Sequence, residues 1–335
     1  MDQVRLGRTG LIVSKNGFGA LPVQRVSMQE AVYLLRKAYD HGINYFDTAH
    51  VYSDSEEKLG NALHDVRENI ILSTKTMTTT VDGFWEQLHT SLKRLRTDYI
   101  DIYQFHNPAF CPKPGDGSGL YEAMLEAREQ GLICHIGITN HRLSVAEEAV
   151  KSDLYETLQF PFSYLAGPKE EALVHLCQQQ DVGFICMKAL AGGLITHSDV
   201  AYAYLAQFPV APIWGIQRER ELDEFLSYNE NPPVLTDARK AFIEKEREEL
   251  AGDFCRGCGY CMPCPVGIQI NTCARMSLLL RRSPAEGYLG TQWQANMKMS
   301  EDCLNCGKCK AHCPYGLDTP ALLRKNYEDY KTFLK

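Results

Sequence analysis

Residues 42–52 read Gly-Ile-Asn-Tyr-Phe-Asp-Thr-Ala-His-Val-Tyr, and the fold can be inferred by working outward from them. The run Ile43–Thr48 has the length and apolar content of a buried strand and ends in polar residues. The preceding stretch Met28–Tyr39 carries apolar side chains at the i, i+3, i+4 and i+7 positions that are typical of an amphipathic helix. Helices that alternate with buried strands indicate an α/β fold with a parallel sheet.

The same alternation recurs along the first 230 residues, after a predicted hairpin formed by Val4–Leu6 and Leu11–Val13. Eight alternations favour a closed (β/α)8 TIM barrel over an open, doubly wound sheet. The open sheet would normally carry a glycine-rich phosphate turn, and Gly17–Ala20 lacks its third glycine. The predicted strands are Gly17–Leu21, Ile43–Thr48, Ile70–Lys75, Tyr99–His106, Cys134–Asn140, Thr157–Ser163, Gly183–Leu190 and Val210–Ile216. The further predicted helices are Trp85–Arg96, Tyr121–Gln130, Val145–Ser152, Glu170–Gln180 and Glu221–Tyr228.

Polar side chains lie at or just after the ends of these strands, where a barrel carries its functional groups. The second strand ends near Asp47 and is followed by Tyr52, the third ends in Lys75, and the fourth in His106. Taken singly, each has an ordinary explanation, such as a helix cap, a surface aromatic, a solvated charge or a satisfied core histidine. Together they bring an acid, a phenol, an amine and an imidazole to one mouth, which predicts an active site.

These four groups suit the protonation of a carbonyl oxygen. A free phenol is a poor acid at neutral pH, and a nearby ammonium favours its ionised form. An aspartate beside the ammonium would hold it charged and in place, and a neutral imidazole could orient a substrate oxygen. The set therefore predicts a general acid poised to donate a proton as a hydride reaches the carbon.

Residues 42–52, Leu72–Lys75, Gln104–Pro108 and Gly131–Asn140 together resemble the aldo-keto reductase family over roughly residues 4 to 228. The resemblance implies Tyr52 as general acid, Asp47 and Lys75 as its tuning pair, and His106 as the group that orients the carbonyl. It also implies NADP(H) or NAD(H) as cofactor and a small carbonyl or alcohol as substrate. The implied cofactor-binding residues are Gly19, Ala20, Thr139, Asn140, Gln159, Met187, Lys188, Leu190, Gly215, Gln217 and Arg218.

The sequence departs from the family pattern where the cofactor is expected. Met187 stands where the family usually places an aromatic residue against the nicotinamide ring, and Lys188 follows it. Glu221 falls near the usual position of an arginine that holds the 2′-phosphate, although Arg218 or Arg220 could compensate. The choice between NADPH and NADH therefore stays open, and a flavin held through Lys188 is an alternative.

Two cysteine blocks follow the barrel region. The first reads Cys-x2-Cys-x2-Cys-x2-Cys-Pro and the second Cys-x2-Cys-x2-Cys-x3-Cys-Pro, which is the bacterial ferredoxin spacing. Paired zinc knuckles are the alternative, but two complete four-cysteine runs better suit two [4Fe–4S] clusters. By the two-cluster pattern each block lends its last cysteine to the other cluster. Cluster one would take Cys255, Cys258, Cys261 and Cys313, and cluster two Cys264, Cys303, Cys306 and Cys309, with Cys273 as a spare.

Composition separates this tail from the rest of the 335-residue chain. Nine of the 13 cysteines follow residue 253, and residues 253–335 carry 11 Lys+Arg against 7 Asp+Glu although the whole chain has a net charge of −7. We therefore expect a barrel over residues 1–232, a connecting helix over 233–252, and a mainly helical ferredoxin-like domain over 253–335. The helix-like stretch Cys273–Arg282 lies between the two blocks.

The chain has no apolar run long enough to span a bilayer and no leader-like start, which predicts a cytoplasmic protein. Its acidic net charge argues against nucleic acid as a main partner. The whole sequence resembles the iron–sulfur branch of the aldo-keto reductases and suggests low-oxygen metabolism. Three functions stay open: a carbonyl reductase; an oxidoreductase linked to a ferredoxin or flavodoxin; and a non-catalytic redox sensor or electron-transfer partner.

Overall fold

The computed structural model describes residues 2–250, 254–282 and 285–334, and its chain divides into two compact units. The first comprises Met1–Ala189 and Asp199–Lys240, and the second comprises Leu190–Ser198 and Ala241–Lys335. The predicted start of the iron–sulfur domain at residue 253 lies outside the described residues. Within the described parts, none of the helices is both long and apolar enough to cross a membrane.

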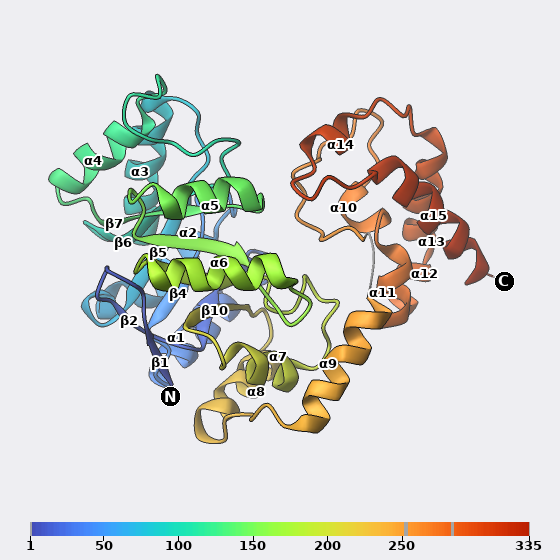
Figure 1. Cartoon of the computed structure of the whole chain (residues 1–335), viewed down its shortest axis with the longest axis horizontal. Helices are drawn as coiled ribbons and strands as arrows, with labels where there is room; N and C mark the ends of the chain where they lie inside the picture. The colour runs from blue at the N-terminus through green and yellow to red at the C-terminus, as the bar shows by residue number, and fades with distance from the viewer. Residues whose placement is uncertain (1, 251–253, 283–284, 335) are drawn as a thin grey trace. The chain divides into compact units, whose positions relative to one another are not determined.

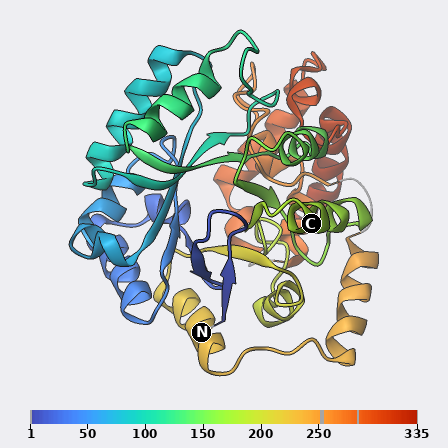
Figure 2. The ribbon, with the colours of Figure 1, turned by 60° about the vertical axis from the view of Figure 1, so that its left-hand side comes forward.

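The first unit is a closed barrel of eight parallel strands with helices packed around it (Figures 1 and 2). The strand order closes β10 onto β3, so the predicted TIM barrel is confirmed. The barrel strands are β3 (Gly17–Gly19), β4 (Tyr45–Asp47), β5 (Ile71–Thr76), β6 (Ile100–His106), β7 (Ile133–Thr139), β8 (Thr157–Pro161), β9 (Gly183–Met187) and β10 (Val210–Gly215). Its helices are α1 (Met28–Asp40), α2 (Ser55–Leu63), α3 (Val81–Leu95), α4 (Leu120–Glu129), α5 (Leu143–Lys151), α6 (Pro168–Gln179), α7 (Ser198–Leu205) and α8 (Glu219–Glu230).

The predicted N-terminal hairpin is present as β1 (Gln3–Arg5) paired antiparallel with β2 (Ile12–Ser14). Leu6 and Val13 from this hairpin are buried in one apolar cluster with Tyr45, Ile102 and Ile213 of the barrel strands. The hairpin therefore contributes to the barrel core, because its apolar side chains lose their contact with water there.

Several predicted strands are longer than those in the structure: Gly17–Leu21 ends at Gly19, Ile43–Thr48 is reduced to Tyr45–Asp47, and Thr157–Ser163 ends at Pro161. The strand expected over Gly183–Leu190 ends at Met187, and Lys188 has a backbone φ of +55°. A left-handed residue cannot continue a strand, so the chain turns away at this point. Leu190 then belongs to the second unit.

The second unit is helical in its described residues. The helix expected over Cys273–Arg282 is instead two short helices, α10 and α11, separated by Ala274 and Arg275. The connecting stretch forms α9, which is shared between the two units. The helices are α9 (Asp237–Glu249), α10 (Ile270–Cys273), α11 (Met276–Arg282), α12 (Glu286–Leu289), α13 (Thr291–Lys298), α14 (Lys308–His312) and α15 (Thr319–Thr332).

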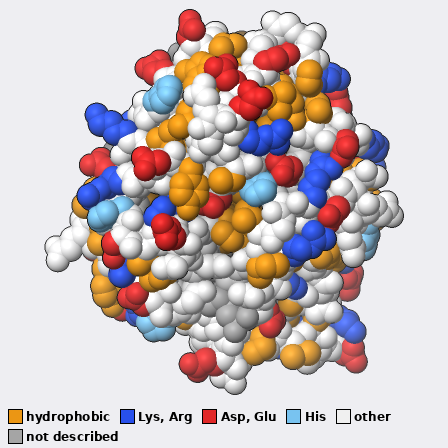
Figure 3. Space-filling model, turned by 90° about the vertical axis from the view of Figure 1, so that its left-hand side faces the viewer, with side chains coloured by type: hydrophobic (Ala, Val, Ile, Leu, Met, Phe, Trp, Pro, Cys, Tyr) orange, Lys and Arg blue, Asp and Glu red, His pale blue; other side chains and the backbone are white. Residues whose placement is uncertain are grey.

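Acidic and basic side chains are mixed on one face of the molecule. On the face shown in Figure 3, acidic and basic side chains are interspersed rather than gathered into one basic stripe. Nucleic-acid-binding proteins usually gather their basic residues on one face.

Candidate active site and cysteine clusters

A buried ion pair lies at the carboxyl ends of β4 and β5. The Lys75 ammonium donates to Asp47 Oδ1 over 2.6 Å and also to the carbonyl of Thr48, and both charged side chains are at most 3% exposed. The other Asp47 oxygen accepts a 2.6 Å hydrogen bond from Ser73 Oγ. Such a pair persists in a barrel interior because each charge and its hydrogen-bonding capacity are satisfied.

The other two predicted catalytic side chains lie beside this pair. Lys75 Nζ is 5.6 Å from the centre of the Tyr52 ring, and the Tyr52 and His106 rings meet edge to face with centroids 5.8 Å apart. His106 is the last residue of β6, and Tyr52 lies in the loop after β4. The structure thus brings the four residues together from three adjacent strand ends.

Burial shifts the pKa values of both basic groups. Burial lowers the pKa of Lys75, while Asp47 acts in the opposite direction by its charge and its hydrogen bond. Burial and the nearby Lys75 charge lower the pKa of His106 to about 3. Its imidazole is therefore neutral at pH 7, and its Nδ1 is buried with no hydrogen-bond partner among the described residues. A neutral, unsatisfied imidazole is suited to a hydrogen bond with a ligand.

Two glutamines that the sequence analysis did not place in the catalytic set support the aspartate. Gln104 Nε2 donates to Gln159 Oε1 over 3.0 Å, and both glutamine amides lie 3.4 Å from Asp47 oxygens. Gln104 is fully buried in β6, and its Oε1 has no partner among the described residues. Gln159 was predicted to bind the cofactor, but here it is also part of the Asp47 network. The sequence places Gln104 inside a predicted strand but does not show which side chains it will meet.

The residues predicted to hold a nicotinamide amide are partly engaged already. Asn140 Nδ2 donates to the carbonyl of Pro108, and its Oδ1 accepts from the backbone N–H groups of His141 and Arg142. Thr139, the last residue of β7, accepts a hydrogen bond at its Oγ1 from the backbone N–H of Asn107. These hydrogen bonds of Asn140 order the chain just before α5.

The remaining predicted cofactor residues lie at the strand ends on either side of the β10–β3 junction and after β9. Gly19 ends β3 and Gly215 ends β10, while buried Ala20 donates its N–H to the carbonyl of Asp47. Met187 is half-buried and packs against the interior apolar cluster. The Glu221 carboxylate accepts from the backbone N–H groups of Gln217 and Arg218 and so begins α8.

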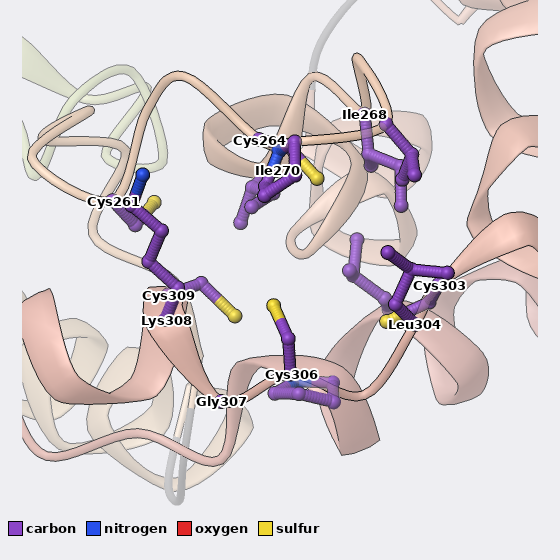
Figure 4. A pocket seen from close by; sticks show the side chains of 14 residues that line it. Cys261, Cys264, Ile268, Ile270, Cys303, Leu304, Cys306, Gly307, Lys308 and Cys309 are labelled. Atoms are coloured by element: carbon purple, nitrogen blue, oxygen red, sulfur yellow. The ribbon is translucent and has the colours of Figure 1, made fainter.

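In the second unit, five cysteines line one pocket. Cys264 of the first block lies there with Cys303, Cys306 and Cys309 of the second (Figure 4). Cys261 also borders the pocket, and its other lining side chains are mainly apolar, such as Ile268. The sulfurs of Cys303, Cys306 and Cys309 point into this space (Figure 4).

The other block of cysteines forms a second group. Burial raises the pKa of Cys255, and Cys258 and Cys313, which lie within electrostatic reach of it, raise it further. Cys261 lies within electrostatic reach of Cys255 and Cys258. Among the described residues no three His, Cys, Asp or Glu side chains are close enough to bind one metal ion. The cysteines of the pocket surround a space, as thiolate ligands of a polynuclear cluster do. The chemistry of both cysteine groups fits [4Fe–4S] clusters.

Comparison with known families identifies both units. The model of the aldo/keto reductase family matches residues 15–200, and that of a 4Fe-4S dicluster domain matches residues 254–318. The oxidoreductase YqkF of Bacillus subtilis is 30% identical over 76% of this chain and 79% of its own length. An L-galactose dehydrogenase of Arabidopsis thaliana is 31% identical over 57% of this chain and 66% of its own.

Solved structures agree with these matches. An aldo-keto reductase from Bacillus halodurans, in its holo form, superposes with a TM-score of 0.66 and 26% identity. The match covers 73% of this chain and 96% of that one. The similarity therefore extends from the sequence motifs to the barrel as a whole.

Proposed function

This chain belongs to the aldo/keto reductase family, and on that premise we propose that it reduces a small carbonyl compound with NADPH or NADH. It is an oxidoreductase that carries a 4Fe-4S dicluster domain in addition to its barrel. The observation that supports this function best is the buried Lys75–Asp47 pair beside Tyr52 and His106. A reduced nicotinamide, when bound, supplies the hydride.

In this proposal the chain's own residues donate the proton and stabilise the donor after it has lost that proton. Tyr52 donates its phenolic proton to the carbonyl oxygen as that oxygen becomes negative. The Lys75 ammonium stabilises the phenolate that remains, and Asp47 holds Lys75 charged and oriented. Neutral His106 orients the same oxygen by a hydrogen bond, while Gln104 and Gln159 donate to the two carboxylate oxygens of Asp47.

The cysteines of the second unit hold two clusters in this proposal. Cluster one takes Cys255, Cys258, Cys261 and Cys313, and cluster two takes Cys264, Cys303, Cys306 and Cys309. The pocket that Cys264 shares with the second block supports the exchange of the last cysteines between blocks.

Replacement of Tyr52 by phenylalanine tests the catalytic assignment. Tyr52→Phe keeps the ring that packs against His106 but has no proton to donate, so we expect kcat/KM for carbonyl reduction to fall at least ~100-fold. Nucleotide affinity should stay unchanged because the ring remains. Steady-state kinetics over a panel of aldehydes and ketones measures the first, and fluorescence titration measures the second. Turnover retained near the wild-type rate would refute the role of Tyr52.

The dicluster domain favours one second candidate, an oxidoreductase that exchanges electrons with a ferredoxin or flavodoxin. Clusters of this type transfer single electrons, whereas nicotinamide transfers a hydride. Such a function would need a flavin or a radical-stabilising substrate in the barrel. A flavin retained by the purified protein would favour it.

A further inference from the structure

Helix α2 carries a buried carboxylate that the proposed mechanism does not use. Glu56, in the first turn of α2, is 1% exposed, as is Lys75. Its Oε1 accepts a 2.6 Å hydrogen bond from the Oγ1 of Thr74, the residue before Lys75 on β5. Burial of a carboxylate is costly unless the group is paired and hydrogen-bonded, so its presence beside the catalytic lysine calls for a role.

Two basic side chains lie near the other oxygen of this carboxylate. Glu56 Oε2 is 3.6 Å from Arg94 Nη1 of α3 and 3.9 Å from His50 Nδ1, and it accepts no hydrogen bond from the described residues. The Arg94 side chain is 37% exposed, so water and salt screen its charge. Burial lowers the pKa of His50, so its imidazole is mostly neutral at pH 7. The negative charge of Glu56 is therefore compensated only in part by these two groups.

Glu56 also connects the loop of Tyr52 to the strand of Lys75. His50, two residues before Tyr52, donates its backbone N–H to the Lys75 carbonyl over 3.1 Å. Glu56, four residues after Tyr52, accepts from Thr74 of the same strand. The loop is thus hydrogen-bonded to β5 on both sides of Tyr52, and these bonds help to set how far the Tyr52 ring lies from the Lys75 ammonium.

The charge of Glu56 acts on Lys75 as well. Together with Asp47, it opposes the lowering of the Lys75 pKa that burial causes. Asp47 does so through a direct hydrogen bond, whereas Glu56 acts by its charge. The titratable and charged groups that face these two residues are Asp47 on β4, Tyr103 and His106 on β6, Arg94 on α3, and His50 and Tyr52 in the loop after β4.

We propose that Glu56 is a positioning residue that keeps the Lys75 ammonium charged and fixes its distance from Tyr52. Removal of a nearby negative charge makes it easier for the coupled Tyr52–Lys75 pair to lose a proton, whichever of the two groups releases it. Glu56 therefore extends to higher pH the range in which Tyr52 still carries the proton for the carbonyl oxygen. This inference rests on the proposed function only in assigning that proton transfer to Tyr52.

Glu56→Gln tests the charge alone, because the amide oxygen of glutamine can still accept from Thr74. We expect the alkaline limb of the pH profile of kcat/KM to move down by about one pH unit. Thr74→Val removes the hydrogen bond and keeps the charge, so kcat should fall severalfold while the alkaline limb stays in place. An unchanged kcat in Thr74→Val would refute the part of the proposal that concerns distance.

Glu57→Gln is the matched control. It makes the same chemical change at the next residue of α2, whose side chain is exposed, and should leave the alkaline limb where it is. Should Glu56→Gln not fold, Arg94→Gln alters the same cluster from its exposed side. Loss of this cation leaves the negative charge of Glu56 less compensated, so the limb should move to higher pH. A shift to lower pH, or none, would overturn the proposal.

A second measurement needs no substrate. The ultraviolet absorbance of ionised tyrosine is titrated in the anaerobic holoprotein with and without Tyr52→Phe, and the difference isolates Tyr52. In the presence of Glu56→Gln this difference should appear at lower pH. If neither the alkaline limb nor the Tyr52 titration moves in a folded, cluster-loaded Glu56→Gln protein, the proposal is wrong. If no carbonyl compound is reduced by the wild type, the proposed function fails, while the ultraviolet titration still decides the role of Glu56.

Discussion

Lys75 keeps a charge in the barrel interior only because its surroundings compensate it. Its ammonium donates to Asp47 and to the carbonyl of Thr48, and Asp47 in turn accepts from Ser73. Removing one partner of such a buried pair typically costs about 3–5 kcal/mol, because the other charge is left uncompensated. An arrangement of this cost is expected at a functional site rather than in a purely structural core.

His106 gives the barrel a specific sensitivity to acid. Its folded pKa is about 3, below the value of 6.5 for an unperturbed histidine, so the unfolded chain binds a proton that the folded chain rejects between these values. The stability it contributes is complete above pH 6.5 and is lost as the pH falls, by at most about 1.4 kcal/mol per pH unit. In His106→Gln we therefore expect the free energy of unfolding to fall less steeply between pH 7 and pH 5.

Urea titrations at pH 7, 6 and 5, followed by tryptophan fluorescence, measure this slope. Wild type and variant should be compared at the same cluster content, because acid also damages clusters. Identical slopes in the two proteins would show that His106 does not carry the effect.

At the level of secondary structure, the sequence predicted the barrel because its strands are apolar runs between amphipathic helices. The sequence did not predict α2. The buried face of this helix includes the polar residues Ser55, Glu56 and Lys58, so the helix lacks the usual apolar stripe. The prediction also joined α10 to α11, because the helical periodicity continues across Arg275, whose contacts with Gly192 and Gly257 are not local in sequence.

The candidate site was likewise predicted only in part. Asp47, Tyr52, Lys75 and His106 could be found because each lies at or just after the end of a strand and matches a family motif. Gln104 could not, since its importance depends on the register that pairs β6 with both β5 and β7. Within a single sequence a glutamine inside a strand carries no sign of which neighbour it will meet.

Helix α2 packs closely against the end of α3 at Gly60. A Cβ atom at this position would lie 2.2 Å from the Arg94 carbonyl oxygen and 2.8 Å from the Leu95 carbonyl carbon. Because both contacts are backbone, the helices must move apart, and we expect Gly60→Ala to lower the free energy of unfolding by about 1–3 kcal/mol. Glu57→Ala, on the exposed face of the same helix, should change it by less than ~0.5 kcal/mol. Urea midpoints from circular dichroism test this; equal effects would refute the packing argument.

At the scale of the whole molecule, the chain joins a barrel to a domain of opposite charge balance. Residues 253–335 have 11 Lys+Arg against 7 Asp+Glu, whereas the whole chain has a net charge of −7. Clusters with four thiolate ligands are negative, so a local excess of Arg and Lys stabilises them. Arg275 illustrates this, since it is partly buried, lies within electrostatic reach of Cys255 and has no carboxylate partner among the described residues.

The two units differ in the number of electrons that they transfer. A nicotinamide gives up two electrons as a hydride, and a [4Fe–4S] cluster takes one, so the carbonyl reductase proposed here needs no electron exchange between them. We expect NADPH or NADH, added to the anaerobic protein, to give no reduced-cluster signal in electron paramagnetic resonance, whereas dithionite gives one. The Tyr52→Phe protein should behave in the same way, because proton donation is not involved. A cluster signal with either nicotinamide would contradict this expectation; it would require a one-electron intermediary and would favour the ferredoxin-linked oxidoreductase instead.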